Sequence, residues 1–318
     1  MKVLAVVILS YLFLTSCSIQ RIAIGQLAPA LSSASPKLQE EKNWDLFKNG
    51  TPGSLQLAEI LLVSDPGNQD LLALLTKGYA AYGFVVNDTE YLGEKLADVD
   101  EPVHRVRAVQ NLAKALDFGF QYLKDNDVTY QGLLKAGKTG KSVAYLNDKL
   151  DSDDSLDLET SFFTGTAWLL LANLRKDNMM LVSQVTSAFQ LIEWVCTNKP
   201  DFQMGLCSTM TGVYHLARPK SLGGKPGLAV KLMKAAMKKN PQNLMIPVVY
   251  MEWYLLPFEK EKEYRILKKL LKAKFKKKSM EHFIPGEVLK RDHDMLNLFN
   301  AMAEKRFEAI VKNESEIF

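Results

Sequence analysis

The residue types that most often carry catalysis or bind metal ions are scattered along this sequence. Its four histidines are His104, His215, His282 and His293. None of them forms a pair at helical spacing with an acidic partner, as a HExxH zinc site requires. The acidic run "DSDDSLDLE", residues 151–159, places Leu156 and Phe162 where an EF-hand calcium loop needs glycine and glutamate. We therefore expect no enzyme activity, metal site or cofactor.

Two further stretches are better explained by local structure than by chemistry. We expect residues 151–159 to form a solvated loop whose acids favour the start of the next helix. The stretch "SLGGKPG", residues 221–227, has the glycines of a phosphate-binding loop but neither its spacing nor its lysine–serine end. We expect it to be a turn between helices.

A set of aromatic and basic residues is the first place to look for a ligand. Aromatic side chains in helical repeats usually fill the core, but those with a polar tip also suit a ligand groove. The aromatic candidates are Tyr79, Tyr82, Trp168, Tyr214, Trp253 and Tyr254. His215 follows Tyr214 and is a candidate for the same groove or a partly buried structural histidine. Arg218, Lys220 and Lys225 are candidate anion contacts or ordinary surface charges.

The strongest concentration of charge is "RILKKLLKAKFKKKS", residues 265–279. We expect a helix whose lysines form a wet face and whose apolar residues pack inward. These apolar residues are Ile266, Leu267, Leu270, Leu271 and Phe275. The alternative is that the basic face contacts anionic lipid heads or an acidic partner.

The elements that would position these residues are helices in repeated units. Long segments such as "LAVKLMKAAM" space their apolar residues as an amphipathic helix does, and short breakers such as "SDPGN" and "NPQN" separate them. Ala229, Met233, Ala236 and Pro241 lie at the spacing of the second helix of a tetratricopeptide repeat. The same spacing before Pro200 and Pro66 selects two further sets: Ala188, Ile192 and Val195, and Ser54, Ala58 and Leu61.

The positions that follow the three prolines also match. Gly78, Gly212 and Trp253 lie equally far beyond Pro66, Pro200 and Pro241. The predicted unit is therefore a helix, a proline turn and a second helix, used at least three times. Such units bury their apolar faces by stacking. We expect an all-α fold, a single tetratricopeptide-like solenoid of helical hairpins over residues 41–318.

The start of the chain indicates the compartment. One lysine, Lys2, precedes the apolar run from Val3 to Leu14, as in a secretory signal peptide. The following "LTSC" resembles the bacterial lipobox, which implies removal of residues 1–16 and lipidation of Cys17. The alternative is an ordinary cleaved signal. With the lipobox, residues 17–40 would form a lipidated tether and a first helix, outside the cytoplasm and bound to a membrane. Ser18 weakly favours the outer membrane.

Composition and cysteine usage further limit which partners and which covalent links the sequence predicts. Removal of Lys2 changes the net charge from +4 to +3, which gives no reason to expect a nucleic-acid partner. Cys196 and Cys207 flank Pro200 and would face each other across a hairpin, but at unequal distances from that turn. A disulfide and two separate buried thiols therefore remain alternatives, and the second is favoured.

Several blocks, in this order, resemble the T component of TRAP transporters. They are "CSIQRIAIGQLAPALS", "GSLQLAEILLVSDPGNQDLLALLTKGYAAYGF", "SFFTGTAWLLLANLRKDNMMLVSQV" and "YHLARPKSLGGKPGLAVKLMKAAMKKNPQNLMIPVVYMEWY". The resemblance implies a periplasmic lipoprotein with a tetratricopeptide-like solenoid, assembled as a homotrimer with a central opening. It also implies an extracytoplasmic solute-binding protein as partner and a small organic ligand, a carboxylate or an apolar molecule, passing between them.

Two other functions stay open at this point. The chain would serve as a helical-repeat scaffold for outer-membrane or cell-wall assembly if it had no small ligand. A cell-envelope hydrolase would need a nucleophile with a base, or a metal cluster, and the sequence nominates neither.

Overall fold

The computed structural model describes residues 21, 23–279 and 295–316. The predicted signal peptide, Cys17, His282 and His293 lie outside these residues. Within them the structure consists of helices and turns, with no strand, so the predicted all-α class is confirmed. Among the described helices, none is both long and apolar enough to cross a membrane.

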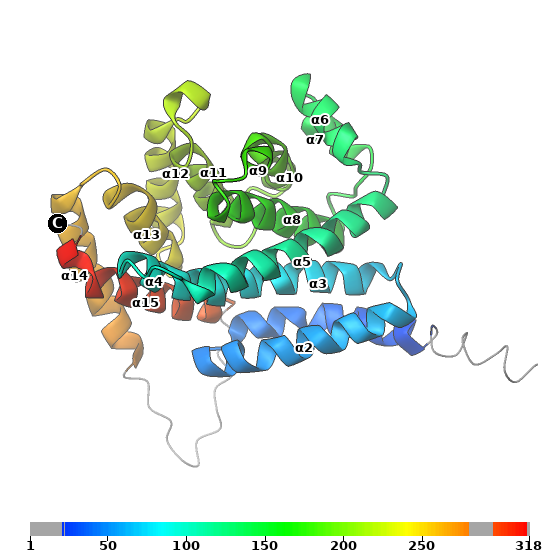
Figure 1. The fold of residues 1–318 in the computed structure, drawn as a ribbon, viewed down its shortest axis with the longest axis horizontal. Helices are drawn as coiled ribbons and strands as arrows, with labels where there is room; N and C mark the ends of the chain where they lie inside the picture. The colour runs from blue at the N-terminus through cyan, green and yellow to red at the C-terminus, as the bar shows by residue number, and fades with distance from the viewer. Residues whose placement is uncertain (1–20, 22, 280–294, 317–318) are drawn as a thin grey trace, which may run out of the picture.

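The first half of the chain builds the larger of two hydrophobic clusters (Figure 1). Residues 23–34 are helical, and α2 and α3 follow them along the lower side of the view. The elements are η1 (Ser35–Glu40), α2 (Trp44–Ser64), α3 (Gln69–Tyr82), η2 (Gly83–Asp88), α4 (Thr89–Leu96), α5 (Val103–Asp125), α6 (Tyr130–Lys138), α7 (Ser142–Asn147), α8 (Ser155–Leu174), α9 (Met179–Ser183) and α10 (Val185–Asn198). Helix α8 is the centre of this cluster and packs on α3, α5 and α10.

The second half builds a smaller cluster and returns to the first. Its elements are α11 (Leu206–Leu216), η3 (Lys220–Leu222), α12 (Pro226–Lys239), α13 (Met245–Tyr250), η4 (Met251–Leu255), α14 (Glu261–Ser279), α15 (Asn297–Lys312) and η5 (Glu314–Glu316). Helix α15 packs on α4 and η1 as well as on α13. The Asn297 side chain donates a hydrogen bond to the Glu40 carbonyl oxygen at 3.1 Å, so the end of the chain is held against its beginning.

Side-chain caps set where several helices begin. Asn43, Asn68 and Asp154 each accept a hydrogen bond from a backbone N–H in the first turn of α2, α3 and α8. Asp154 belongs to the acidic run, so the prediction that these acids favour the start of the next helix is confirmed. The expected solvated loop over residues 151–159 is wrong in its second half, because α8 already begins at Ser155. Asp157 is buried there and accepts a hydrogen bond from the Tyr122 hydroxyl at 2.6 Å. The "SLGGKPG" stretch is a turn, as expected: Gly223 has a φ of +84°, and a Cβ on Gly224 would lie 1.9 Å from the Arg218 carbonyl oxygen.

The proline-based alignment identifies the buried faces of two helices and misplaces a third. The six residues aligned before Pro200 and Pro241 are all buried: Ala188, Ile192, Val195, Ala229, Met233 and Ala236. Before Pro66, Ala58 is buried as predicted, but Ser54 is exposed and Leu61 is only half-buried, and α2 buries Leu55 and Leu62 in their place. Helix α2 lies at the lower edge of the molecule and packs chiefly on α3, so only a narrow stripe of it is covered (Figure 1). The tetratricopeptide-like character of the stacking stays a prediction.

The prediction for the basic helix is wrong at two positions. Helix α14 buries Leu271 and Phe275, as expected, together with Tyr264. Ile266 and Leu270, which were expected to pack inward, are 64% and 47% exposed. The helix contacts its neighbours along one narrow stripe, and these two residues lie on its outer side.

Cys196 and Cys207 form a disulfide, contrary to the favoured expectation of separate thiols. Their Cα atoms are 5.5 Å apart. The proline is not the centre of the turn, because three residues with positive φ, Gln203, Met204 and Gly205, extend it toward α11. Helix α10 ends at Asn198 and α11 begins at Leu206, so each cysteine lies within a turn of its own helix end. A disulfide agrees with an oxidising compartment.

Removal of this disulfide should lower stability measurably. The bond closes a short loop, with a sequence separation of 11 residues, for which chain-entropy arguments give about 3 kcal/mol. We expect the free energy of unfolding of the variant Cys196→Ala/Cys207→Ala to be lower by that amount, so that its urea midpoint falls. Reductant should bring the wild-type protein to the same midpoint. Equal midpoints for the oxidised wild type and the variant would show that the thiols are not paired.

Candidate functional site

A pocket of about 310 Å³ lies where the two hydrophobic clusters meet. Helices α4, α8, α11, α13 and α15 supply its walls, so both halves of the chain contribute. Much of the wall is apolar and includes Leu170, Met210, Val249 and Phe299. A largely apolar pocket with a few polar groups is the usual form of a small-molecule site.

A buried ion cluster forms one side of this pocket. Arg306 of α15 is 2% exposed. Its Nε and Nη2 donate to the Glu252 carboxylate at 3.0 and 2.7 Å, and its Nη1 donates to Asp88 Oδ2 at 2.9 Å. Nη1 also donates to the Thr89 hydroxyl at 3.2 Å. The fork of the guanidinium therefore ties α15 to two distant segments of the chain.

The two carboxylates lie on the two short π-helical segments. Asp88 is the last residue of η2, and Glu252 is the second of η4. A π-turn adds a residue to a helical turn and re-aims the side chains that follow, and such turns are frequent at functional sites. Burial raises the pKa of Glu252 and Arg306 opposes this rise. Desolvation disfavours the charge of Arg306, but the two carboxylates outweigh it and raise its pKa.

A wider cleft of about 950 Å³ leads to the pocket. The two share Tyr91, Lys95, Asn173 and Lys176, so these residues form the passage between them. Lys176 is solvent-exposed but is crowded by the walls of the cleft. This partial burial, with the charge of Lys95 nearby, lowers the pKa of Lys176. The positive charges of Lys95 and Lys176 repel each other at the neck of this apolar pocket, so a bound anion would stabilise both.

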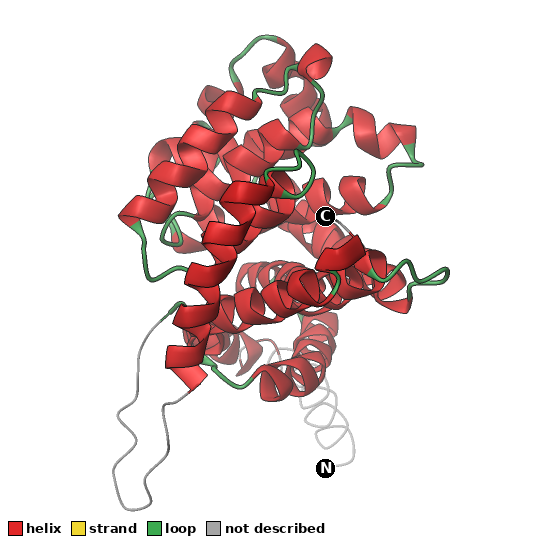
Figure 2. Cartoon of the chain, turned by 90° about the vertical axis from the view of Figure 1, so that its left-hand side faces the viewer, coloured by secondary structure: helices red, strands yellow, loops and turns green. Residues whose placement is uncertain are grey.

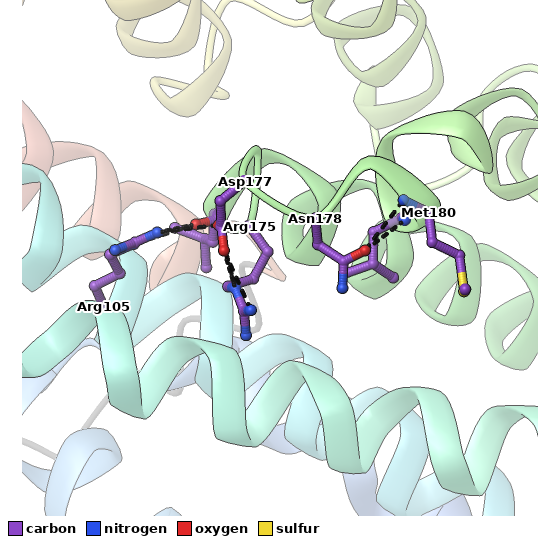
Figure 3. A network of polar contacts seen from close by, with 7 residues as sticks. Arg105, Arg175, Asp177, Asn178 and Met180 are labelled. Atoms are coloured by element: carbon purple, nitrogen blue, oxygen red, sulfur yellow. Dashed lines mark hydrogen bonds and ion pairs between the residues drawn. The ribbon is translucent and has the colours of Figure 1, made fainter.

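Ion pairs and caps fix the turn between α8 and α9 at the cleft (Figure 3). Arg105 of α5 donates to the Leu174 carbonyl oxygen at 2.6 Å, which satisfies a free carbonyl at the end of α8. Asp177 lies between Arg105, at 3.8 Å, and Arg175, at 3.3 Å. Asn178 accepts from the backbone N–H groups of Met180 and Leu181 and so starts α9.

The structure distributes the predicted ligand residues over several places. Of the ten, Trp253 lines the central pocket. Tyr254 stacks between Tyr250 and Phe258 on the same turn. Trp168 is buried and donates from Nε1 to Gln184 at 3.2 Å, beside Phe120 and Tyr130.

Two tyrosines of α3 have structural partners. The Tyr79 hydroxyl bonds to Glu59, and its ring stacks on Phe118. The Tyr82 hydroxyl donates to the Lys48 carbonyl oxygen at 3.0 Å. Both contacts join α3 to α2, which accounts for these residues as packing elements.

Tyr214, His215 and Arg218 do come together, at the end of α11. The Tyr214 ring lies between Phe189, at a centroid distance of 3.8 Å, and the Arg218 guanidinium, also at 3.8 Å. Arg218 donates to the Gly223 carbonyl oxygen at 3.1 Å and so closes the glycine turn. Burial lowers the pKa of His215, and Arg218 and Lys225 lower it further. Lys220 and Lys225 are exposed.

Sequence reasoning missed the residues that form the pocket neck and the ion cluster. Lys95 and Lys176 carry no local pattern that separates them from other surface lysines. Arg306 does carry one, because it stands among the residues of the apolar stripe of α15, which are Met302, Ala303, Phe307 and Ile310. A charge inside such a stripe signals a buried ion pair. Within the described residues no cluster of histidine, cysteine or acidic groups is arranged to hold a metal ion.

The ion cluster should contribute strongly and in a pH-dependent way to stability. Arg306→Met leaves two carboxylates buried without a cation, so we expect a loss of about 3–5 kcal/mol at pH 7 in urea unfolding. In the variant Glu252 loses the cation that opposes the rise of its pKa by burial, so the stability of the variant falls as the pH rises through the pKa of this carboxyl group. The deficit should therefore be smallest near pH 4.

The matched control is Lys305→Met on the same helix. Lys305 is exposed and pairs only with Glu308, so its loss should cost less than about 0.5 kcal/mol. Similar deficits for the two variants at pH 7 would contradict the assigned role of Arg306.

The comparison with protein families gives one match. The family model described as the TRAP transporter T-component covers residues 40–318. No curated protein matches the sequence.

Proposed function

The chain belongs to the TRAP transporter T-component family, and we propose that it serves such a solute-uptake system as a non-enzymatic lipoprotein outside the cytoplasm. In this proposal it binds an extracytoplasmic solute-binding protein and holds the small ligand that passes between them. Lipidation of Cys17 would tether it to a membrane, with the outer membrane favoured.

The observation that carries the proposal is the path from the wide cleft past Lys95 and Lys176 into the central pocket. The inner pocket offers apolar contacts, and the neck offers two positive charges. This combination fits a small organic anion with an apolar part. The anion would compensate the two neighbouring cations. The partial burial of Lys176, and then the charge of Lys95, lower the pKa of Lys176.

The surface beside the cleft is suited to a protein partner. Val103 and Val106 line the cleft and are exposed. Met179 and Met180 of α9 are 73% and 72% exposed, and Figure 3 shows Met180 next to the turn that Arg105 holds. Methionine side chains adapt to the surface they meet. We place the solute-binding protein here, where its own ligand would lie close to the cleft.

A separate surface supports the proposed homotrimer. The outer face of α2 presents exposed Leu46, Leu57, Ile60 and Val63. These residues lie opposite the buried stripe of α2, at the lower edge of the molecule in Figure 1. Exposed apolar patches of this kind often mark interfaces. In this proposal α2 is the contact between copies, and the cleft stays open to the partner.

Site-directed crosslinking in native cells tests the partner. We expect a photo-crosslinking residue at Val106 or Met180 to capture a solute-binding protein, and the same residue at exposed Lys138 on α6 to capture none. Mass spectrometry identifies what is captured. Capture of outer-membrane or cell-wall assembly proteins alone would contradict the transporter role and favour a repeat scaffold.

An apolar anionic dye, anilinonaphthalene sulfonate, tests the pocket. We expect Lys95→Gln/Lys176→Gln to weaken the dye about tenfold, since two favourable charge contacts are lost. We also expect dye binding to the wild type to fall as the pH rises, earlier than for ordinary lysines because the pKa of Lys176 is lowered. The charge-matched control is Lys138→Gln/Lys141→Gln, which should bind as the wild type does; equal weakening in both variants would exclude the neck as the anion site.

A further inference from the structure

Helix α14 presents an outer surface that none of the roles above uses. It lies at the left-hand end of Figure 1, and this end faces the viewer in Figure 2, where no other helix covers it. Its buried side is formed by Tyr264, Leu271 and Phe275. Over residues 261–276, whose burial the structure describes, the opposite side is exposed.

This outer surface combines apolar and cationic side chains. Ile266 and Leu270 project outward, one helical turn apart, at 64% and 47% exposure. Lys262 and Lys269 are exposed beside them and form no ion pair within the part of the chain that the structure describes. Positions three, four and seven apart share a helix face, so Lys262, Ile266, Lys269 and Leu270 lie on one side of α14.

The acidic residues near α14 lie at the beginning of the helix or are already paired with a cation. Glu261 pairs with Arg265 at 2.5 Å, and Glu263 pairs with Lys234 at 2.7 Å. Glu314 of η5 pairs with Lys268, on the side of α14 that faces the protein. Glu304 and Glu308 of α15 lie in a groove with Lys272, on another flank of α14. The outer surface thus carries positive charge and exposed apolar groups.

We propose that the outer surface of α14, defined by Lys262, Ile266, Lys269 and Leu270, binds the surface of an anionic phospholipid bilayer. Lysines provide diffuse attraction to anionic head groups, and the two apolar side chains enter the boundary between head groups and acyl chains. The α14 surface would be a second membrane contact, independent of the lipid expected on Cys17.

The chemistry favours a bilayer over an acidic protein. Protein and phosphate sites that require a defined geometry favour arginine, because its planar fork binds two oxygens at once. The α14 surface uses lysine instead, a flexible point charge that needs only a negative field. A protein partner would need a matching groove to accept Ile266 and Leu270, whereas a bilayer accepts apolar side chains without a preformed groove.

Vesicle sedimentation tests this inference on the chain from residue 17 onward, made with Cys17→Ser so that it carries no acyl chain. We expect it to bind vesicles of phosphatidylcholine with phosphatidylglycerol at low salt, to be released at high salt, and not to bind pure phosphatidylcholine vesicles. Lys262→Gln/Lys269→Gln should weaken binding about tenfold. Ile266→Ser/Leu270→Ser should also weaken it.

The control variant removes the same charge elsewhere. Lys138→Gln/Lys141→Gln changes two exposed lysines near α6 and α7 and should bind as the wild type does. Circular dichroism would confirm that all variants are equally folded. Absence of binding to anionic vesicles, equal binding to neutral ones, or equal weakening by the control would each overturn the proposal.

Discussion

A buried guanidinium requires carboxylates around it, and this requirement shapes the molecule. Arg306 is almost fully removed from water and is stable as a cation only between Asp88 and Glu252. Asp88 comes from η2, Glu252 from η4 and Arg306 from α15. Satisfying one charge therefore folds α15 back across the stacked helices and joins the two hydrophobic clusters.

The central pocket follows from this junction. If only apolar side chains lined the space between the two clusters, they would pack together and close it. The charged groups of the ion cluster, in contrast, must keep fixed positions on one wall, and the space stays open beside them. The two π-helical segments place Asp88 and Glu252 at that wall. On the open side, Arg105 and Asp177 hold the turn after α8 (Figure 3), which keeps Lys176 at the neck. The proposed ligand path thus depends on polar contacts at both ends of an apolar space.

The features that could be predicted from the sequence are local ones. Periodicity and proline turns give the helical class. The residues aligned before Pro200 and Pro241 are buried as predicted, because they lie on the sides of α10 and α12 that pack on neighbouring helices. Long-range features could not be predicted. The Arg306 cluster joins residues more than two hundred positions apart, and the disulfide depends on positive-φ residues that displace the turn from Pro200. For α14, periodicity cannot tell which apolar residues have a neighbour, so Ile266 and Leu270 were misplaced.

Native-state hydrogen exchange tests most directly whether the Arg306 junction holds the two halves together around the pocket. The amides of α4, η4 and α15 would be followed at increasing, sub-denaturing urea concentration. Our account predicts that the opening free energies of the three segments converge, because they belong to one cooperative unit. Exchange of α15 at much lower free energy, with α4 and η4 still protected, would show that the pocket forms without the junction and would contradict the account.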